Sequence, residues 1–234
     1  MHQTALACVL FLACLLSACR TVPPPEDTAV LATPPQAGTA PSASAPRYVV
    51  DPAASEIRLL VYRAGALARF GHNHVIRGPL RGEIRAGESA SDSGFRLEIP
   101  VAALAIDPPE ARAEEGEEFS AEVSEQARQG TRANMLGKDL LDAADHPLIR
   151  IEALALSGPR STPTVTARAT LRGATRALRF PAAVTQQADQ LTVTASFRVR
   201  QSDFGITPFS ALGGGLEVRD AVDIRIRLVA RRGG

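Results

Sequence analysis

Apolar and polar residues alternate along several stretches of the chain. Residues 191–200 show this most clearly, because Leu191, Val193 and Ala195 are separated by threonines. The same period recurs in four other runs, although Leu60 interrupts the first of them: residues 57–62, 95–101, 165–171 and 222–228. Alternation places successive side chains on opposite faces of a strand, one in the core and one in water. Short strands of this kind, separated by Gly and Pro turns, predict an antiparallel all-β fold, either a barrel or a sandwich.

One segment departs from the two-residue period. Residues 110–146 are polar and rich in Glu, and they carry an apolar stripe at helical spacing. The stripe consists of Val123, Ala127, Met135, Leu136, Leu140 and Leu141. Because Gly130 and Gly137 would break a single long helix, we expect one or two short helices that close or flank the β domain. The acidic run of Glu114, Glu115, Glu117 and Glu118 lacks the ligand spacing of a calcium loop and is predicted to be a solvated face.

The first nineteen residues have the pattern of a bacterial export signal. Residues 6–16 form an apolar run of roughly ten residues, which is too short to span a membrane. The run ends in Leu16-Ser17-Ala18-Cys19, which resembles the lipobox, where bacterial lipoproteins are lipidated and cleaved. We therefore expect residues 1–18 to be a signal peptide and Cys19 to carry acyl chains that anchor the protein to a membrane. The alternatives are an ordinary signal peptide cut elsewhere and a buried helix.

The residues after Cys19 predict where the anchored protein resides. Arg20 follows the cysteine in place of Asp, which by resemblance to the usual sorting rule favours the outer membrane. The expected location is therefore the cell envelope, facing the periplasm. Prolines interrupt residues 19–46 throughout, so this stretch is expected to be a semi-extended tether. The chain thus divides into a signal peptide at 1–18, a lipidated tether at 19–46 and one β domain at 47–232.

Composition argues against several classes of function. The net charge of +1 and the aromatic content of 4% provide neither the basic surface nor the stacking residues that nucleic-acid binding requires. All three cysteines lie within the first nineteen residues, so the β domain has no disulfide and no thiolate metal site. The sequence contains no G-x-S-x-G nucleophile elbow and no phosphate loop. We therefore expect a protein without enzymatic activity and without a cofactor.

Four motifs, in order, resemble the YceI-like family over residues 47–231. They are Tyr48–Ser55, with its Val, Asp, Pro and Ser; Asp139–Ala143 followed by Pro147; Leu171–Phe180 with Gly173 and Thr175; and Phe204–Ile206 with Val218–Val222. The resemblance implies an antiparallel, lipocalin-like β-barrel of about eight strands with a short helical insertion. It also implies a periplasmic protein that holds a polyisoprenoid- or quinone-type lipid inside the barrel.

The chain also departs from the family's pattern. It contains no tryptophan, and Leu140, Leu141 and His146 stand where aromatic residues are typical or common. The segment Gly71-His72-Asn73-His74 marks a variant branch. These departures leave the shape of the pocket and the identity of the ligand open.

Small side chains at the predicted inward positions favour a hollow barrel. The inward alanines are Ala153, Ala155, Ala167, Ala169, Ala182 and Ala195. They leave volume in which an apolar, isoprenoid-like lipid can bind. The candidate ligand-binding residues are Leu59, Val61, Leu97, Ile99, Ala167, Ala169, Phe180, Val193, Ala195, Phe197, Ile224 and Ile226. The alternative is that larger side chains fill this space, which would make the protein a structural component of the envelope.

Three histidines follow the signal peptide, and they allow a different function. His72 and His74 are two residues apart, so on a strand they point the same way and can share a metal ion. With His146 as a third ligand, the chain would be a metal- or haem-binding protein or a metal-dependent hydrolase. Two other interpretations are that these histidines contact a ligand headgroup, or that they make hydrogen bonds that cap the barrel mouth.

Overall fold

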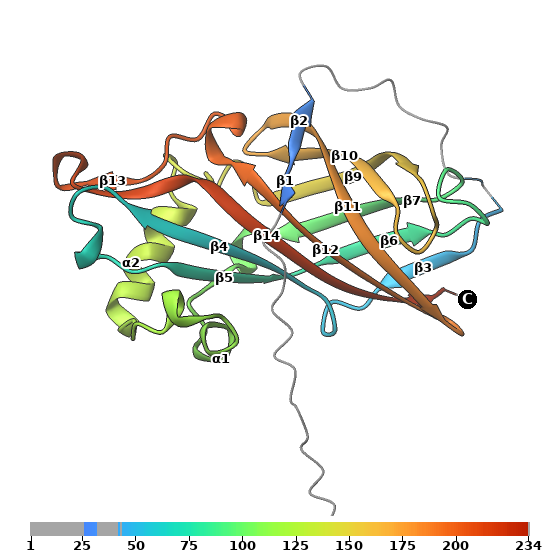
Figure 1. The fold of residues 1–234 in the computed structure, drawn as a ribbon, viewed down its shortest axis with the longest axis horizontal. Helices are drawn as coiled ribbons and strands as arrows, with labels where there is room; N and C mark the ends of the chain where they lie inside the picture. The colour runs from blue at the N-terminus through green and yellow to red at the C-terminus, as the bar shows by residue number, and fades with distance from the viewer. Residues whose placement is uncertain (1–25, 32–41, 43, 234) are drawn as a thin grey trace, which may run out of the picture.

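The computed structural model of the chain describes residues 26–31, 42 and 44–233 (Figure 1). The predicted signal peptide and the lipidation site Cys19 lie outside the described residues. The strands are β1 (Glu26–Asp27), β2 (Ala29–Leu31), β3 (Arg47–Val50), β4 (Glu56–Ala64), β5 (His74–Pro79), β6 (Arg81–Arg85), β7 (Gly94–Pro100), β8 (Ala105–Ile106), β9 (Leu148–Ser157), β10 (Thr164–Leu171), β11 (Ala174–Gln187), β12 (Gln190–Arg200), β13 (Ser210–Ala211) and β14 (Leu216–Arg232). The α-helices are α1 (Pro109–Ala113) and α2 (Glu125–Leu136), and the 3₁₀ helices are η1 (Ala68–Phe70), η2 (Val101–Ala103), η3 (Glu117–Phe119), η4 (Gln201–Phe204) and η5 (Leu212–Gly214).

Eight strands form a closed antiparallel barrel. Their order is β12-β11-β10-β9-β7-β6-β3-β14, and β14 pairs again with β12. The closing ladder runs from the pair Gln190–Arg231 to the pair Arg200–Ala221. Each of the eight strands therefore has a hydrogen-bonded neighbour on both sides over at least part of its length. The predicted all-β, antiparallel barrel of about eight strands is therefore confirmed.

The motif at residues 48–55 forms a bend between β3 and β4. Both strands pair with β14, so together they act as one interrupted strand. Within the bend, the Ser55 hydroxyl donates to the Val229 carbonyl at 3.1 Å and accepts from the Val229 amide at 2.9 Å. Asp51 accepts a hydrogen bond from the Ala53 amide at 3.1 Å. Ser55 thus supplies bonds to β14 where the ladder is interrupted, and Asp51 stabilises the bend itself.

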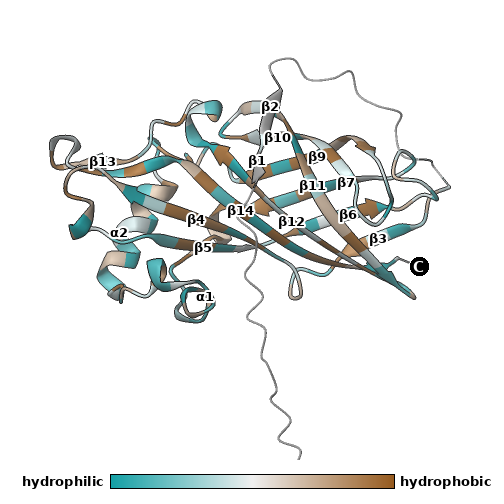
Figure 2. Cartoon of the chain, in the orientation of Figure 1, coloured by the Kyte–Doolittle hydropathy of each residue, from teal (hydrophilic) through white to brown (hydrophobic). Residues whose placement is uncertain are grey.

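Alternation along the strands decides which side chains face the barrel interior. On β12, Leu191 and Phe197 are buried and Thr194 is exposed, and hydropathy alternates in the same way along the strands of Figure 2. The prediction was wrong for Ala155, which is exposed. A bulge on β9 at Leu154, opposite Thr166 and Ala167, shifts the register between β9 and β10. After the bulge, Leu156 rather than Ala155 lines the interior.

The insertion between β8 and β9 covers part of the outer face of the barrel. It contains α1 and α2, which confirms the predicted short helices. Leu60 points outward from β4 and packs with Val75, Ala111 and Phe119 in a separate apolar cluster. Leu60 therefore breaks the alternation because it is apolar on the outer face of β4, where it packs against the insertion. Among the described residues, none of the helices combines the length and the apolar character that a membrane span needs.

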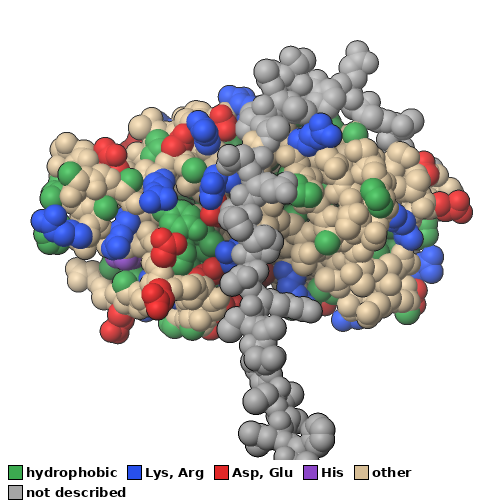
Figure 3. All heavy atoms as spheres, viewed as in Figure 1, with side chains coloured by type: hydrophobic (Ala, Val, Ile, Leu, Met, Phe, Trp, Pro, Cys, Tyr) green, Lys and Arg blue, Asp and Glu red, His purple; other side chains and the backbone are tan. Residues whose placement is uncertain are grey.

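The acidic run in this insertion is only partly solvated. Glu117 and Glu118 are exposed, as predicted. The prediction was wrong for Glu115, whose side chain is 4% exposed and pairs with Arg58 at 2.9 Å and Arg225 at 2.7 Å. Both arginines stand on the outer face of the barrel, and once the insertion covers them they need a carboxylate partner. On the face drawn in Figure 3, basic and acidic side chains are intermixed.

Part of the segment predicted as a tether pairs with the barrel. β1 runs parallel to β12 at Phe197 and Arg198, and β2 runs antiparallel to β11 at Ala177–Arg179. The ladder between β11 and β12 themselves covers only residues 182–187 and 190–195. The two short strands therefore occupy the edges that remain where β11 and β12 separate (Figure 1).

Candidate functional site

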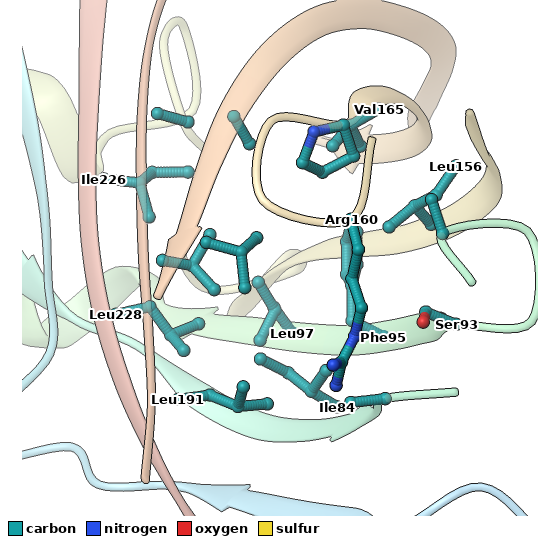
Figure 4. Close-up of a pocket in the computed structure, with 18 of the residues that line it drawn as sticks. Ile84, Ser93, Phe95, Leu97, Leu156, Arg160, Val165, Leu191, Ile226 and Leu228 are labelled. Carbon is teal, nitrogen blue, oxygen red and sulfur yellow. The ribbon is translucent and has the colours of Figure 1, made fainter. Parts of the chain in front are cut away.

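Two apolar cavities lie in the part of the barrel interior that the described residues enclose. The first, named the loop chamber, has a volume of about 100 Å³ and lies beside the loops that precede β7 and β10. The part of its wall that Figure 4 labels comprises Ile84, Ser93, Phe95, Leu97, Leu156, Arg160, Val165, Leu191, Ile226 and Leu228. Arg160 is the charged residue among those that line it, and Figure 4 shows its side chain reaching from its loop toward Ile84 and Phe95. Its guanidinium donates to the Gln186 side chain at 2.6 Å, so this chamber has a polar rim.

The second cavity, named the helix chamber, has a volume of about 160 Å³. Met135 at the end of α2, and Leu140 and Leu141 just after it, form part of its wall. Phe204 and Ile206, which follow β12, contribute another part. The apolar stripe of the insertion was recognised in the sequence, but these five residues were not among the predicted ligand-binding residues. Period and composition indicate that a stripe is buried, and they do not indicate which cavity it covers.

Two phenylalanines lie at the boundary between the chambers. Phe180 lines the loop chamber and Phe197 lines the helix chamber, and their rings stack at 4.1 Å between centroids with an interplanar angle of 15°. The same boundary appears along β10, where Val165 lines the first chamber and Ala169 the second. We name the Phe180–Phe197 pair the partition, since it stands where one long interior is divided into two.

Most of the predicted ligand-binding residues line one of the chambers. Leu97, Phe180, Val193, Ala195 and Ile226 line the loop chamber, and Leu59, Val61, Ile99, Ala169, Phe197 and Ile224 line the helix chamber. Ala167 is fully buried but lines neither chamber, because it lies on β10 between Val165 and Ala169, at the level of the partition. The structure therefore brings these residues together on the inner surface of the barrel.

The histidines form a separate polar cluster with a residue that the sequence analysis missed. The rings of His72 and His74 make an edge-to-face contact, with centroids 4.5 Å apart and an interplanar angle of 67°. The Nδ1 atom of His74 lies 2.7 Å from the Oδ2 atom of Asp107, whose side chain is fully buried. Asp107 also accepts hydrogen bonds from the Val75 amide at 2.8 Å and from Arg112 at 2.6 Å. No sequence motif marks Asp107, which reaches the histidines only because β8 pairs with β5.

The environment of the cluster sets its charges. Burial alone would raise the pKa of Asp107, but the hydrogen bonds from His74, Val75 and Arg112 hold it below its usual value. Burial, followed by repulsion from His74 and Arg112, lowers the pKa of His72. The arrangement therefore favours an ionised Asp107 carboxylate and a neutral His72 imidazole.

The structure does not bring His146 to this cluster. Its ring lies against Gly173, in the turn between β10 and β11. The metal-ligand atoms that come together among the described residues belong to His72, His74 and Asp107. The predicted set of three histidines is therefore wrong. His146 precedes β9, and β9 begins in a different part of the sheet from the start of β5, where His72 and His74 lie. His72 and His74 also line neither chamber.

Comparisons with known proteins identify the family of the chain and structures with a similar fold. A YceI-like domain model matches residues 48–230, and no curated protein sequence matches the chain. The crystal structure of BcnA from Burkholderia cenocepacia has a TM-score of 0.54 at 16% identity, and the match covers 77% of this chain and 98% of BcnA. A YCEI protein from Campylobacter jejuni has a TM-score of 0.48 at 13% identity, with 66% and 82% covered. Since the domain model spans most of the sequence, the chain belongs to the YceI-like family.

Proposed function

We propose that the protein is a lipoprotein of the cell envelope that binds an apolar, isoprenoid- or quinone-like lipid inside its barrel and catalyses no reaction. The observation that carries this proposal is the pair of apolar chambers inside a closed sheet. Buried apolar surface contributes roughly 25 cal/mol per Å², so an apolar chain gains free energy by leaving water for these chambers. Membership of the YceI-like family supports the same class of ligand.

The dimensions of the chambers restrict how such a ligand fits. An engineered apolar cavity of about 150 Å³ binds benzene. The helix chamber, at about 160 Å³, therefore has room for a ring or for a short branched segment of chain, and the loop chamber, at about 100 Å³, has room for a smaller group. A longer isoprenoid needs both chambers and must displace the partition between them. Its polar end would lie at the rim of the loop chamber, where Arg160 and Gln186 offer hydrogen bonds.

Filling the loop chamber is the direct test of binding inside the barrel. We expect Ala195→Phe to weaken the binding of farnesol at least tenfold, because the new ring occupies the space of the ligand, and a tenfold change is about 1.4 kcal/mol. Thr194→Phe is the matched control, since Thr194 is the next residue on β12 and is exposed. Calorimetric titration of the purified protein measures both affinities. Equal affinities in the two variants, or no binding by the wild type, would contradict the proposal.

The membrane anchor is tested separately, in cells. Full-length protein made in a bacterium is expected to incorporate radiolabelled palmitate and to fractionate with the outer membrane, because Cys19 supplies the acylated thiol. Cys19→Ser should lose the label, and Cys14→Ser should keep it. Label that persists in Cys19→Ser would rule out this lipidation site and leave the proposal for the barrel untouched.

A further inference from the structure

The cluster of His72, His74 and Asp107 lies outside both lipid chambers, where the chain enters β5. Each of the three residues offers one ligand atom, and these atoms lie within 4.8 Å of one another. From this geometry we infer that the three residues bind one divalent transition-metal ion, of which Zn²⁺ is the simplest probe. This site is independent of the lipid and replaces His146 by Asp107 as the third ligand.

The backbone between the two histidines is fixed by Asn73. Its side-chain oxygen accepts a hydrogen bond from the Arg63 amide at 3.0 Å, and its side-chain nitrogen donates one to the Glu118 carbonyl at 2.9 Å. Its own carbonyl accepts a hydrogen bond from Arg112 at 2.7 Å. Residues two apart on extended backbone point the same way, so fixing Asn73 on one side holds both imidazoles on the other. The two nitrogen ligands are therefore in place before an ion binds.

Asp107 presents one oxygen to the histidines and uses the other for structure. Its Oδ1 atom accepts from the Val75 amide and from Arg112, whereas its Oδ2 atom lies 2.7 Å from Nδ1 of His74. Oδ1 thus has two partners and Oδ2 has one, so Oδ2 is the oxygen that can bind the ion, in exchange for its hydrogen bond with His74.

His72 supplies the strongest sign of a missing partner. Its Nε2 atom is buried and has no hydrogen-bond partner among the described residues. A buried polar atom without a partner costs about 1–3 kcal/mol. A metal ion between His72 and His74 would satisfy this nitrogen.

The donor set indicates the kind of ion. Two imidazole nitrogens and one carboxylate oxygen suit Zn²⁺, Fe²⁺, Ni²⁺ or Cu²⁺, whereas Ca²⁺ and Mg²⁺ prefer oxygen ligands alone. Three protein ligands leave one position of a tetrahedral site for water or another small ligand. Both histidines are partly exposed, so an ion can reach them from solvent.

The experiment titrates the chelator-treated full chain, in detergent, with Zn²⁺ alone. We expect one ion per chain with a Kd on the order of 1 µM or tighter, measured by calorimetry and elemental analysis. His72→Asn and His74→Asn should each weaken binding about 100-fold, through the loss of one of three ligands. Asparagine is the replacement for His74 because its amide nitrogen can still donate a hydrogen bond to Asp107. His146→Asn is the matched control and should bind as the wild type does.

Bound Co²⁺ provides a second readout that does not depend on the stability of any variant. In the wild type, its visible absorption should be that of a tetrahedral, four-coordinate ion. Added Zn²⁺ should displace the Co²⁺ and abolish this absorption. Absence of Zn²⁺ binding by the wild type would overturn the proposal. So would unchanged binding in the His72→Asn, His74→Asn double variant, or an equal loss of binding in His146→Asn.

Discussion

Asp107→Ala is expected to lower the free energy of unfolding by about 3–5 kcal/mol, because it leaves the buried charge of Arg112 without its partner. Both side chains are shielded from water, at 8% exposure for Arg112 and 0% for Asp107. The Val75 amide loses its acceptor in the same change. The Asp107 backbone has a φ of 49°, which aspartate tolerates better than alanine does. Equilibrium unfolding in guanidinium chloride measures the difference.

The control for this change is Glu110→Ala in α1. Glu110 is also a carboxylate paired with an arginine, but its side chain is 63% exposed and lies 3.4 Å from Arg77. An exposed pair of this kind contributes about 0–1 kcal/mol. If Asp107→Ala destabilises the protein no more than Glu110→Ala does, then the buried pair of Asp107 and Arg112 does not stabilise the fold.

Phe197→Ala is expected to join the two chambers and to destabilise the barrel by about 3–5 kcal/mol, the usual cost of removing a buried phenyl ring. Phe197 is 4% exposed and stacks on Phe180, so its removal leaves the partition with one ring. The variant should then favour longer ligands. Across a series of prenyl alcohols, the ratio of long-chain to short-chain affinity should rise about tenfold relative to the wild type, a change of about 1.4 kcal/mol.

Phe95→Ala is the matched control for length preference. Phe95 also lines the loop chamber, but it lies away from the partition, on β7. Its removal should enlarge one chamber without changing the preference for chain length. If Phe197→Ala does not fold, Phe197→Leu opens the same boundary at a smaller cost. An unchanged ratio in a folded Phe197 variant would show that the stacked rings do not limit ligand length.

The strands followed from local pattern and the barrel from the resemblance to the YceI-like family, and the exceptions to the pattern proved informative. Leu60 breaks the alternation because the insertion buries the outer face of β4. Glu115 looks like a solvated residue in sequence and is buried because two arginines of the barrel wall need it. In both cases the partner is distant in sequence, so a window of neighbouring residues carries no sign of it.

The candidate sites were predictable to different degrees. Alternation placed residues such as Val193 and Ile224 on the inner surface, and they line the chambers. It failed at Ala155, because a bulge adds one residue and turns the strand over. The closeness of His72 and His74 followed from their spacing. Asp107 could not be predicted, since its place beside His74 depends on the pairing of β5 with β8.

The sequence by itself determined that the domain is an antiparallel β fold with one apolar face per strand and a helical insertion, since in a regular strand successive side chains take opposite faces. The tertiary structure alone decided that two stacked rings divide the interior and that a buried aspartate joins the histidines. Those contacts depend on register, closure and bulges across strands, which are set by the whole sheet and not by any one segment of it.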